Sequence, residues 1–241
     1  MSALVERLDR ILYPGIGPHW DDELFRERIL SHLRAKELDV LDLGAGAGIV
    51  PQMNFRGIAR RVCGIDPDHR VRNNPHLDEA RIAEGGRLPY PDECFDVVFA
   101  DNVLEHLQRP EEVFAEVRRV LRPGGAFLAK TPNRRHYVAT LARLTPYAFH
   151  RWFNARRGRP AVDTYPTHYR ANTRTALRRL AEFSGLRLQH VELVEGRPEY
   201  LRISALTYVA GWAYERTVNA FDALEPFRVV LIAELRKPPI T

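Results

Sequence analysis

A glycine-rich segment near residue 44 has the composition of a ligand-binding turn. Its sequence is Asp42-Leu-Gly44-Ala-Gly46-Ala-Gly48, and it follows a short, mostly apolar run. A glycine-rich turn directly after a buried strand lets backbone N–H groups approach a ligand closely. The dinucleotide-binding pattern GxGxxG would place a glycine at position 49, where this chain has Ile49. The pattern therefore favours a ligand that needs space and a carboxylate rather than close contact with a pyrophosphate.

Acidic residues stand at the ends of four expected strands around this turn. They are Asp42, Asp66, Glu84 and Asp101, the last followed by Asn102. The carboxyl ends of parallel strands lie at one edge of a sheet, where open α/β sheets bind ligands. An acidic crevice suits a cationic ligand, and Asp66 stands about where an acid accepts hydrogen bonds from ribose hydroxyls. The pattern indicates a nucleoside-type cofactor, and the alternative is that these acids are helix caps and turn residues.

A sheet must bring these acids together, and apolar runs along the chain predict its strands. Strands are expected at 39–44, 61–66, 80–84, 95–100, 126–129, 186–194 and 227–235. Helices are expected at 21–33, 110–122, 173–183 and 200–224, where apolar residues recur at helical spacing. Strands that alternate with helices predict an α/β protein with a doubly wound, mostly parallel, seven-stranded sheet.

Five short motifs follow one another between residues 38 and 132. They are Val40-Leu-Asp-Leu-Gly-Ala-Gly-Ala-Gly, Gly64-Ile-Asp-Pro-Asp, Leu88-Pro-Tyr-Pro-Asp-Glu-Cys-Phe-Asp-Val-Val, Val103-Leu-Glu-His-Leu and Arg119-Val-Leu-Arg-Pro-Gly-Gly. In this order they resemble class I S-adenosylmethionine-dependent methyltransferases, most closely the group with the type-11 methyltransferase domain. The resemblance implies a Rossmann-like methyltransferase fold with an antiparallel last strand. It also implies S-adenosylmethionine as the cofactor and S-adenosylhomocysteine as the product.

The resemblance assigns a part of the cofactor to each motif. The residues expected to bind the cofactor are Asp42, Gly44, Ala45, Gly46, Asp66, Glu84, Gly85, Asp101 and Asn102. The glycine-rich turn would face the methionine part, Asp66 would hold the ribose, and Asp101 with Asn102 would lie beside the sulfonium. Glu84 and Gly85 would lie by the adenine, although the family commonly has Asp where Glu84 stands. His106 matches a frequent family histidine, for which packing is the main interpretation and catalysis the alternative.

The methyl acceptor is harder to infer than the cofactor. Methyl transfer from a sulfonium mainly needs the acceptor to be aligned with the methyl group and water to be excluded. A neutral hydroxyl or amine acceptor must also lose a proton, whereas a carboxylate acceptor need not. The base candidates are His168 and His136. The alternative for His168 is a turn residue whose neighbours Asn172 and Thr173 cap the next helix. Residues 13–20, rich in Pro and Gly, are either a mobile lid or a simple connector.

The charge of the chain is unevenly distributed. Between Asn133 and Leu180 there are 11 Arg and one acid, Asp163, so this stretch carries +10 and the rest of the +5 chain carries −5. Three interpretations stay open: a solvated face, an anionic acceptor such as a phosphate- or carboxylate-bearing sugar, lipid or metabolite, and nucleic acid. Peripheral membrane contact through Trp152 and Phe153 is a variant of the second interpretation.

The segment after the fifth strand is expected to cover the acceptor. The residues expected to bind the acceptor are Tyr137, Arg151, Arg156, Tyr169 and Arg170. We expect an N-terminal lid and first helix at 1–37 and a cofactor-binding core at 38–132. A helical, Arg-rich acceptor cap at 133–172 would then be followed by the remainder of the same sheet at 173–241.

Composition limits the setting. The chain has 241 residues, of which 45% are hydrophobic and 28% charged, as in ordinary globular domains. Cys63 and Cys94 are the two cysteines, too few for a disulfide framework and without metal-ligand spacing, so no metal is expected. With neither a secretory signal nor a transmembrane segment in the sequence, the cytoplasm is the expected compartment.

Together these features predict an S-adenosylmethionine-dependent methyltransferase. Its acceptor would be small or lipid-linked and anionic, with methylation at oxygen, nitrogen or carbon. Two alternatives stay open. One is an RNA methyltransferase, and the other is a homologue that binds the cofactor without transferring its methyl group.

Overall fold

The computed structural model describes residues 3–33, 37–83, 86–144 and 165–239. They fall into two compact units. The first, called the helical unit, comprises Met1–Asp21, Asn133–Thr164 and Leu193–Val230. The second, called the sheet unit, comprises Asp22–Pro132, Tyr165–Glu192 and Leu231–Thr241.

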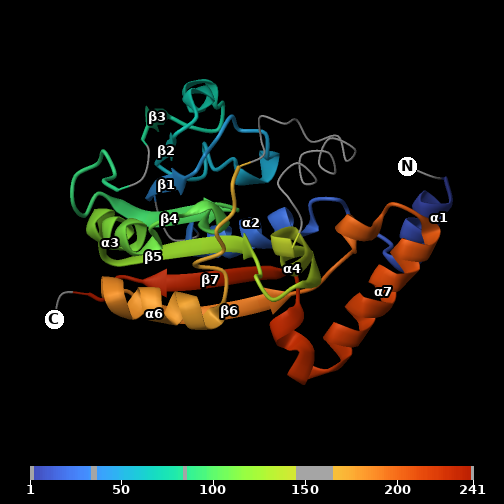
Figure 1. Cartoon of the computed structure of the whole chain (residues 1–241). Coiled ribbons are helices and arrows are strands. Elements are labelled where there is room, and N and C mark those ends of the chain that lie inside the picture. Colours follow the sequence, from blue (N-terminus) through green and yellow to red (C-terminus); the bar gives the residue numbers. More distant parts are fainter. Residues whose placement is uncertain (1–2, 34–36, 84–85, 145–164, 240–241) are drawn as a thin grey trace. The chain divides into compact units, whose positions relative to one another are not determined.

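Helices and strands alternate along most of the chain (Figure 1). The strands are β1 (Asp39–Leu43), β2 (Arg61–Asp66), β3 (Glu79–Ile82), β4 (Phe95–Asp101), β5 (Leu121–Pro132), β6 (Arg187–Val194) and β7 (Val230–Arg236). The helices are α1 (Ala3–Leu12), α2 (Trp20–Leu33), α3 (Pro110–Val120), α4 (Tyr137–Leu144), α6 (Arg174–Ser184) and α7 (Ala205–Ala220). Short 3₁₀ turns lie at Pro51–Met53, His69–Asn73, Leu104–His106, Glu199–Leu201 and Asp222–Phe227.

The strands form one seven-stranded sheet in the order β3-β2-β1-β4-β5-β7-β6. β1 pairs in parallel with β2 and with β4, and the pairs β2–β3 and β4–β5 are also parallel. β7 runs antiparallel to β5, because Gly124 N–H near the start of β5 donates to Lys237 O after β7, whereas Asn133 N–H beyond the end of β5 donates to Val229 O before β7. The predicted doubly wound sheet and its antiparallel last strand are confirmed.

Aromatic side chains hold helices on both faces of the sheet. Phe25 of α2 packs edge-on against Phe99 of β4, with 6.4 Å between ring centroids, and Phe114 of α3 packs against Phe127 of β5 at 5.4 Å. Since Val98 is the register partner of Phe127, Phe99 and Phe127 point to opposite faces. α6 lies beside α3 (Figure 1). Burial on both faces explains why residues 97–100 of β4 and 126–129 of β5 are all apolar.

The N-terminal segment differs from the sequence interpretation. Residues 1–10 alternate polar and apolar residues, and no helix was expected before residue 21, yet Ala3–Leu12 form α1. Val5, Leu8 and Leu12 recur at helical spacing and pack on the cluster that includes Tyr208 of α7. The apolar face of α1 is hard to recognise from the sequence, because the segment is short and polar and its partner Tyr208 is far away in the chain.

Two boundaries also move. α7 spans Ala205–Ala220 rather than 200–224, because Ser204 forms a capping box with Thr207 and 3₁₀ turns flank both ends. β5 begins at Leu121 rather than at 126, so the predicted end of α3 belongs to a strand. The predicted cap of α6 is present at Thr173, whose hydroxyl accepts a hydrogen bond from Ala176 N–H (3.1 Å).

Candidate functional site

The glycine-rich turn after β1 is held against β2 by backbone hydrogen bonds. Gly44 and Ala45 N–H both donate to Ile65 O, at 2.8 and 3.0 Å. Gly44 has a φ of +82°, and a Cβ there would lie 2.4 Å from a methyl carbon of Val103. The conformation and the close approach both require glycine at this position. A Cβ at Gly46 would meet no atom within 4 Å, so the turn is open on that side.

Asp66, the last residue of β2, closes the turn. Its Oδ2 accepts a hydrogen bond from Gly46 N–H (2.9 Å), and its Oδ1 accepts one from Asp68 N–H (2.7 Å). Burial raises the pKa of Asp66, and the two backbone donors act against that rise. Each carboxylate oxygen has a second lone pair, so the side chain retains the capacity to accept hydrogen bonds from hydroxyl groups.

Asp42 lies at the end of β1 and is 6% exposed. Burial raises its pKa well above the ordinary value, and the charges of Asp101 and Asp66 raise it further. These charge effects show that the acids ending β1, β2 and β4 lie close enough to interact. We call the edge formed by Asp42, Asp66, Asp101 and the glycine-rich turn the acidic crevice.

Lys130 of β5 neutralises part of this charge. Its side chain is fully buried, and its Nζ contacts Asp101 Oδ1 (3.0 Å) and Asp22 Oδ1 of α2. Asn102 Nδ2 donates to the same Asp101 oxygen (2.9 Å). Lys130 was not among the residues predicted for the site. The sequence signal for it is a single lysine directly after the apolar residues 126–129 of β5.

Three residues expected near the acceptor contact the segment that follows β4. His168 N–H and Tyr169 N–H both donate to Glu105 O, at 2.6 and 3.2 Å. The guanidinium of Arg170 donates to Gln108 O (2.6 Å). Tyr169 is buried and His168 is half-buried. The structure therefore places the base candidate His168 in the sheet unit, beside the end of β4.

The other base candidate, His136, lies in the helical unit and is 2% exposed. Val138 N–H donates to its Nδ1 (3.4 Å), which leaves the proton on Nε2, 3.4 Å from Glu195 Oε2. Burial lowers the pKa of His136 to about 3 and raises that of Glu195 to about 8, so both groups are uncharged at pH 7. Tyr137, expected to bind the acceptor, packs on His136 and on Tyr214. A group with so low a pKa is a weak base at neutral pH, which argues against His136 as the base.

Four expected site residues lie outside the described residues. They are Glu84 and Gly85, expected near the cofactor, and Arg151 and Arg156, expected near the acceptor. Their assignments stay predictions.

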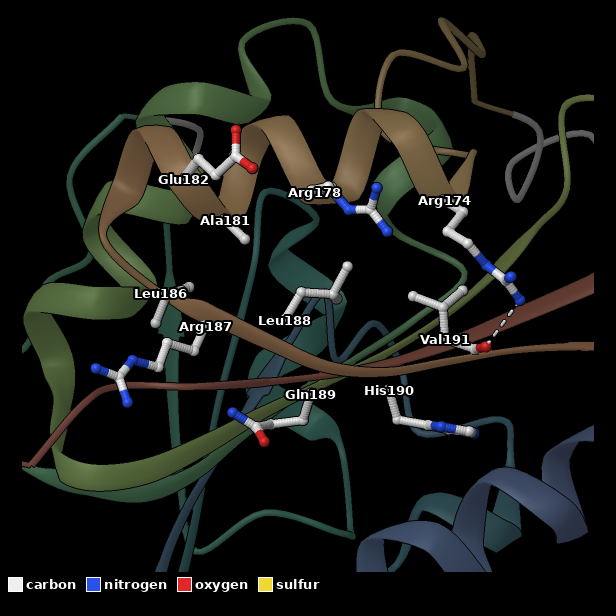
Figure 2. Close-up of a pocket in the computed structure, with 10 residues that line it drawn as sticks. All are labelled: Arg174, Arg178, Ala181, Glu182, Leu186, Arg187, Leu188, Gln189, His190 and Val191. Carbon is white, nitrogen blue, oxygen red and sulfur yellow. Dashed lines mark hydrogen bonds between the residues drawn. The ribbon is translucent and has the colours of Figure 1, made fainter.

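A groove of about 620 Å³ lies between α6 and the edge strand β6, and Figure 2 shows the residues that line it. Its lining is basic, with Arg174, Arg178, Arg187 and His190 beside a single acid, Glu182. β5 and β7 separate β6 from β4 in the sheet. This groove is therefore distinct from the acidic crevice at the ends of β1, β2 and β4.

No helix within the described ranges is long and apolar enough to cross a membrane. In the same part of the chain, no group of three or more His, Cys, Asp or Glu is arranged to hold a metal ion. Cys63 is buried, and burial raises the pKa of its thiol to about 11. It is therefore an unreactive thiol at neutral pH.

Known proteins match the part of the chain that builds the crevice. Residues 41–129 match the family model of the methyltransferase domain. A "Probable S-adenosylmethionine-dependent methyltransferase" of Mycolicibacterium smegmatis is 41% identical over 110 residues, or 44% of this chain and 42% of that protein. The phosphatidylethanolamine N-methyltransferase of Cereibacter sphaeroides is 33% identical over 110 residues, or 42% of this chain and 53% of that protein. The chain thus spans about half or less of the length of these relatives.

The whole fold also recurs in solved structures. The [4+2]-cyclase SpnF superposes with a TM-score of 0.60 at 19% identity, covering 98% of this chain and 94% of that one. At this identity the likeness shows the fold alone. Because that protein is named as a cyclase, the shared fold does not by itself specify a reaction.

The buried pair in the helical unit generates a pH prediction. The ordinary pKa values are 4.5 for Glu195 and 6.5 for His136. Between pH 4.5 and 6.5 the folded chain carries the proton on Glu195, whereas the unfolded chain carries it on His136. The two states then bind the same number of protons, and stability does not change with pH. Between pH 6.5 and 8 only the folded chain holds a proton, on Glu195, so the free energy of unfolding should fall as pH rises, by about 2 kcal/mol.

Urea unfolding at pH 6.5 and 8.5 checks this expectation. Glu195→Gln should remove the fall, because the amide cannot ionise. Glu182→Gln, at an exposed position on α6, should leave the fall unchanged. A fall of the same size in Glu195→Gln would contradict the assignment.

Proposed function

We propose that the chain is a class I S-adenosylmethionine-dependent methyltransferase that transfers the methyl group of S-adenosylmethionine to a small or lipid-linked, anionic acceptor. One observation carries the proposal. Asp42, Asp66 and Asp101 converge beside an open glycine-rich turn at the carboxyl edge of the sheet. The open turn provides space, and the carboxyl groups provide hydrogen-bond acceptors, for the amino-acid and ribose parts of the cofactor.

The described residues of the crevice support this cofactor. Gly44 and Gly46 have positive φ, and the turn has space beside Gly46. The carboxylate of Asp66, fixed by two backbone donors, would accept hydrogen bonds from the ribose hydroxyls. Asp42 and the Asp101–Asn102 pair would lie beside the methionine part and the sulfonium. Glu84 and Gly85 would complete the site near the adenine.

Charge supports the same occupant. Four acidic groups, those of Asp22, Asp42, Asp66 and Asp101, lie in or beside the crevice, and the buried ammonium group of Lys130 contacts two of them, Asp22 and Asp101. The excess of acidic groups favours a cation in the crevice. When bound, S-adenosylmethionine supplies the electrophilic methyl and a neutral leaving group. The chain itself has to align the acceptor, exclude water and, for a hydroxyl or amine, accept a proton.

We assign the last task to His168. The hydrogen bond from its backbone N–H to Glu105 O anchors it beside the turn that follows β4, the strand that ends in Asp101. The half-buried side chain has access to solvent, which a group that releases protons requires.

Arginine supports an anionic acceptor. The stretch from Asn133 to Leu180 carries +10, and Arg binds phosphate and carboxylate groups bidentately. The relative named phosphatidylethanolamine N-methyltransferase acts, by its name, on a phospholipid. On this proposal Tyr137, Arg151, Arg156, Tyr169 and Arg170 contribute to acceptor binding.

The first prediction from the proposed function concerns cofactor binding. Asp66→Ala should weaken binding of S-adenosylhomocysteine by about 10- to 100-fold, because hydrogen bonds to a charged group are lost. Isothermal titration calorimetry measures this affinity. Asp66→Asn, which keeps the shape of the side chain, should also weaken binding. Asp92→Ala, at an exposed surface ion pair, should not. Absence of binding by the unaltered protein would overturn the proposed function.

The second prediction concerns the acceptor. Replacing Arg151, Arg156, Arg157 and Arg159 by Gln should weaken binding of glycerol 3-phosphate and phosphoethanolamine by about tenfold or more. A matched control replaces Arg174, Arg178, Arg179 and Arg187, which removes the same charge from α6 and β6. Equal loss in both variants would indicate general electrostatics. Binding of RNA with a steep salt dependence would favour the RNA alternative.

The third prediction concerns the base. His168→Ala should lower kcat about 100-fold on a hydroxyl or amine acceptor and leave the affinity for S-adenosylhomocysteine unchanged. The acceptor can be found by screening metabolite extracts for uptake of labelled methyl. His190→Ala, exposed in the groove of Figure 2, should retain full turnover. Full turnover by His168→Ala would exclude this base.

A further inference from the structure

Residues 165–172 form a strap that leads into α6 and has two different halves. Residues 169–172 are mostly buried, whereas Tyr165, Pro166 and Thr167 are exposed. Figure 1 shows the strap, in gold, passing the ends of β4 and β5 before it enters α6.

The second half of the strap is firmly anchored. Asn172 Nδ2 donates to Thr131 Oγ1 (2.6 Å) and to Pro132 O (3.1 Å) at the end of β5. Thr131 Oγ1 in turn donates to the buried carboxylate of Glu105 (2.8 Å). Tyr169 has a φ of +51°, an unusual conformation for a side chain of this size. These contacts fix where the strap starts to cross the sheet edge.

The first half is held by side-chain contacts around Tyr165. The phenol donates to Asp68 Oδ2 at 3.3 Å, and the ring packs edge-on against His106 with 5.7 Å between centroids. His106 Nδ1 lies 2.8 Å from Pro166 O. A carbonyl can only accept, so Nδ1 carries the proton and His106 donates to the strap. Tyr165 remains 41% exposed.

The positions of these contacts place the strap over the acidic crevice. Asp68 follows β2 and His106 follows β4, and β1 lies between those two strands in the sheet. A segment tied to both must cross the end of β1, where the glycine-rich turn begins. Burial raises the pKa of the Tyr165 phenol, and the charges of Asp66 and Asp68 raise it further, against the lowering effect of Arg70. The phenol thus lies within electrostatic range of the ribose-binding candidate Asp66.

We propose that Tyr165 is a cofactor contact, whose ring, positioned by His106, closes over the nucleoside half of the bound cofactor and slows its escape. This inference rests on the proposed function. The anchored half of the strap serves as the fixed end, and the Tyr165 half opens when the contacts with Asp68 and His106 are released. His106 is a positioning residue that acts on the cofactor through Tyr165.

Dissociation rates of S-adenosylhomocysteine and 5′-methylthioadenosine, measured by surface plasmon resonance, test the proposal. Tyr165→Ala should raise both rates about tenfold or more, because an aromatic contact is lost from the nucleoside part that both ligands share. The association rates should change less than the dissociation rates. Tyr165→Phe, which keeps the ring, should change the rates about threefold or less. His106→Ala should lie between the two.

Phe183→Ala, which removes an exposed aromatic ring from α6, is the matched control and should leave both rates unchanged. Thermal unfolding confirms that each variant is folded. If Tyr165→Ala leaves both dissociation rates unchanged, the strap proposal is overturned while the proposed function stands. If the unaltered protein binds neither ligand, the proposed function fails and the strap proposal falls with it.

Discussion

The hydrogen bond from Gly46 N–H to the carboxylate of Asp66 is the contact on which the geometry of the crevice depends. It ties the turn after β1 to the end of β2. The parallel pairing of β1 with β2 and with β4 brings the acids that end these three strands to one edge of the sheet. Asp66 can close the turn and still bind hydroxyl groups, since a carboxylate accepts several hydrogen bonds. On the proposed function, the geometry of the turn and the binding of the cofactor therefore depend on the same side chain, that of Asp66.

A cluster of buried acids would be unstable without compensation, because burial disfavours charged carboxylates. Lys130 provides part of that compensation through Asp101 and Asp22. Removing one member of a buried ion pair leaves its partner's charge uncompensated, which is strongly destabilising. The pairing also links α2, which carries Asp22, to the end of β4. The charge balance of the crevice is therefore part of what holds the helix on the sheet.

The sequence was informative where structure is determined locally. Apolar runs, the glycine turn and Thr173 predicted the strands, the crevice and a helix cap, because each depends on neighbouring residues. Lys130 was missed because its partner Asp22 lies 108 positions away. The strap was missed for the same reason, since Asn172 bonds to Thr131, 41 positions earlier. His168 was chosen for its chemistry, and only the contact with Glu105 shows where it lies.

The strap links the two halves of the proposed reaction. Tyr165, proposed to cover the cofactor, and His168, proposed as the base, stand three positions apart on the same short segment. On the proposed function, closure of the Tyr165 half would exclude water from the site beside His168, which its hydrogen bond to Glu105 O already holds in place. Transfer converts a sulfonium into a neutral thioether, which the acids of the crevice attract less strongly. Loss of that attraction would favour product release, so the acidic groups that capture the cofactor need not retain its product.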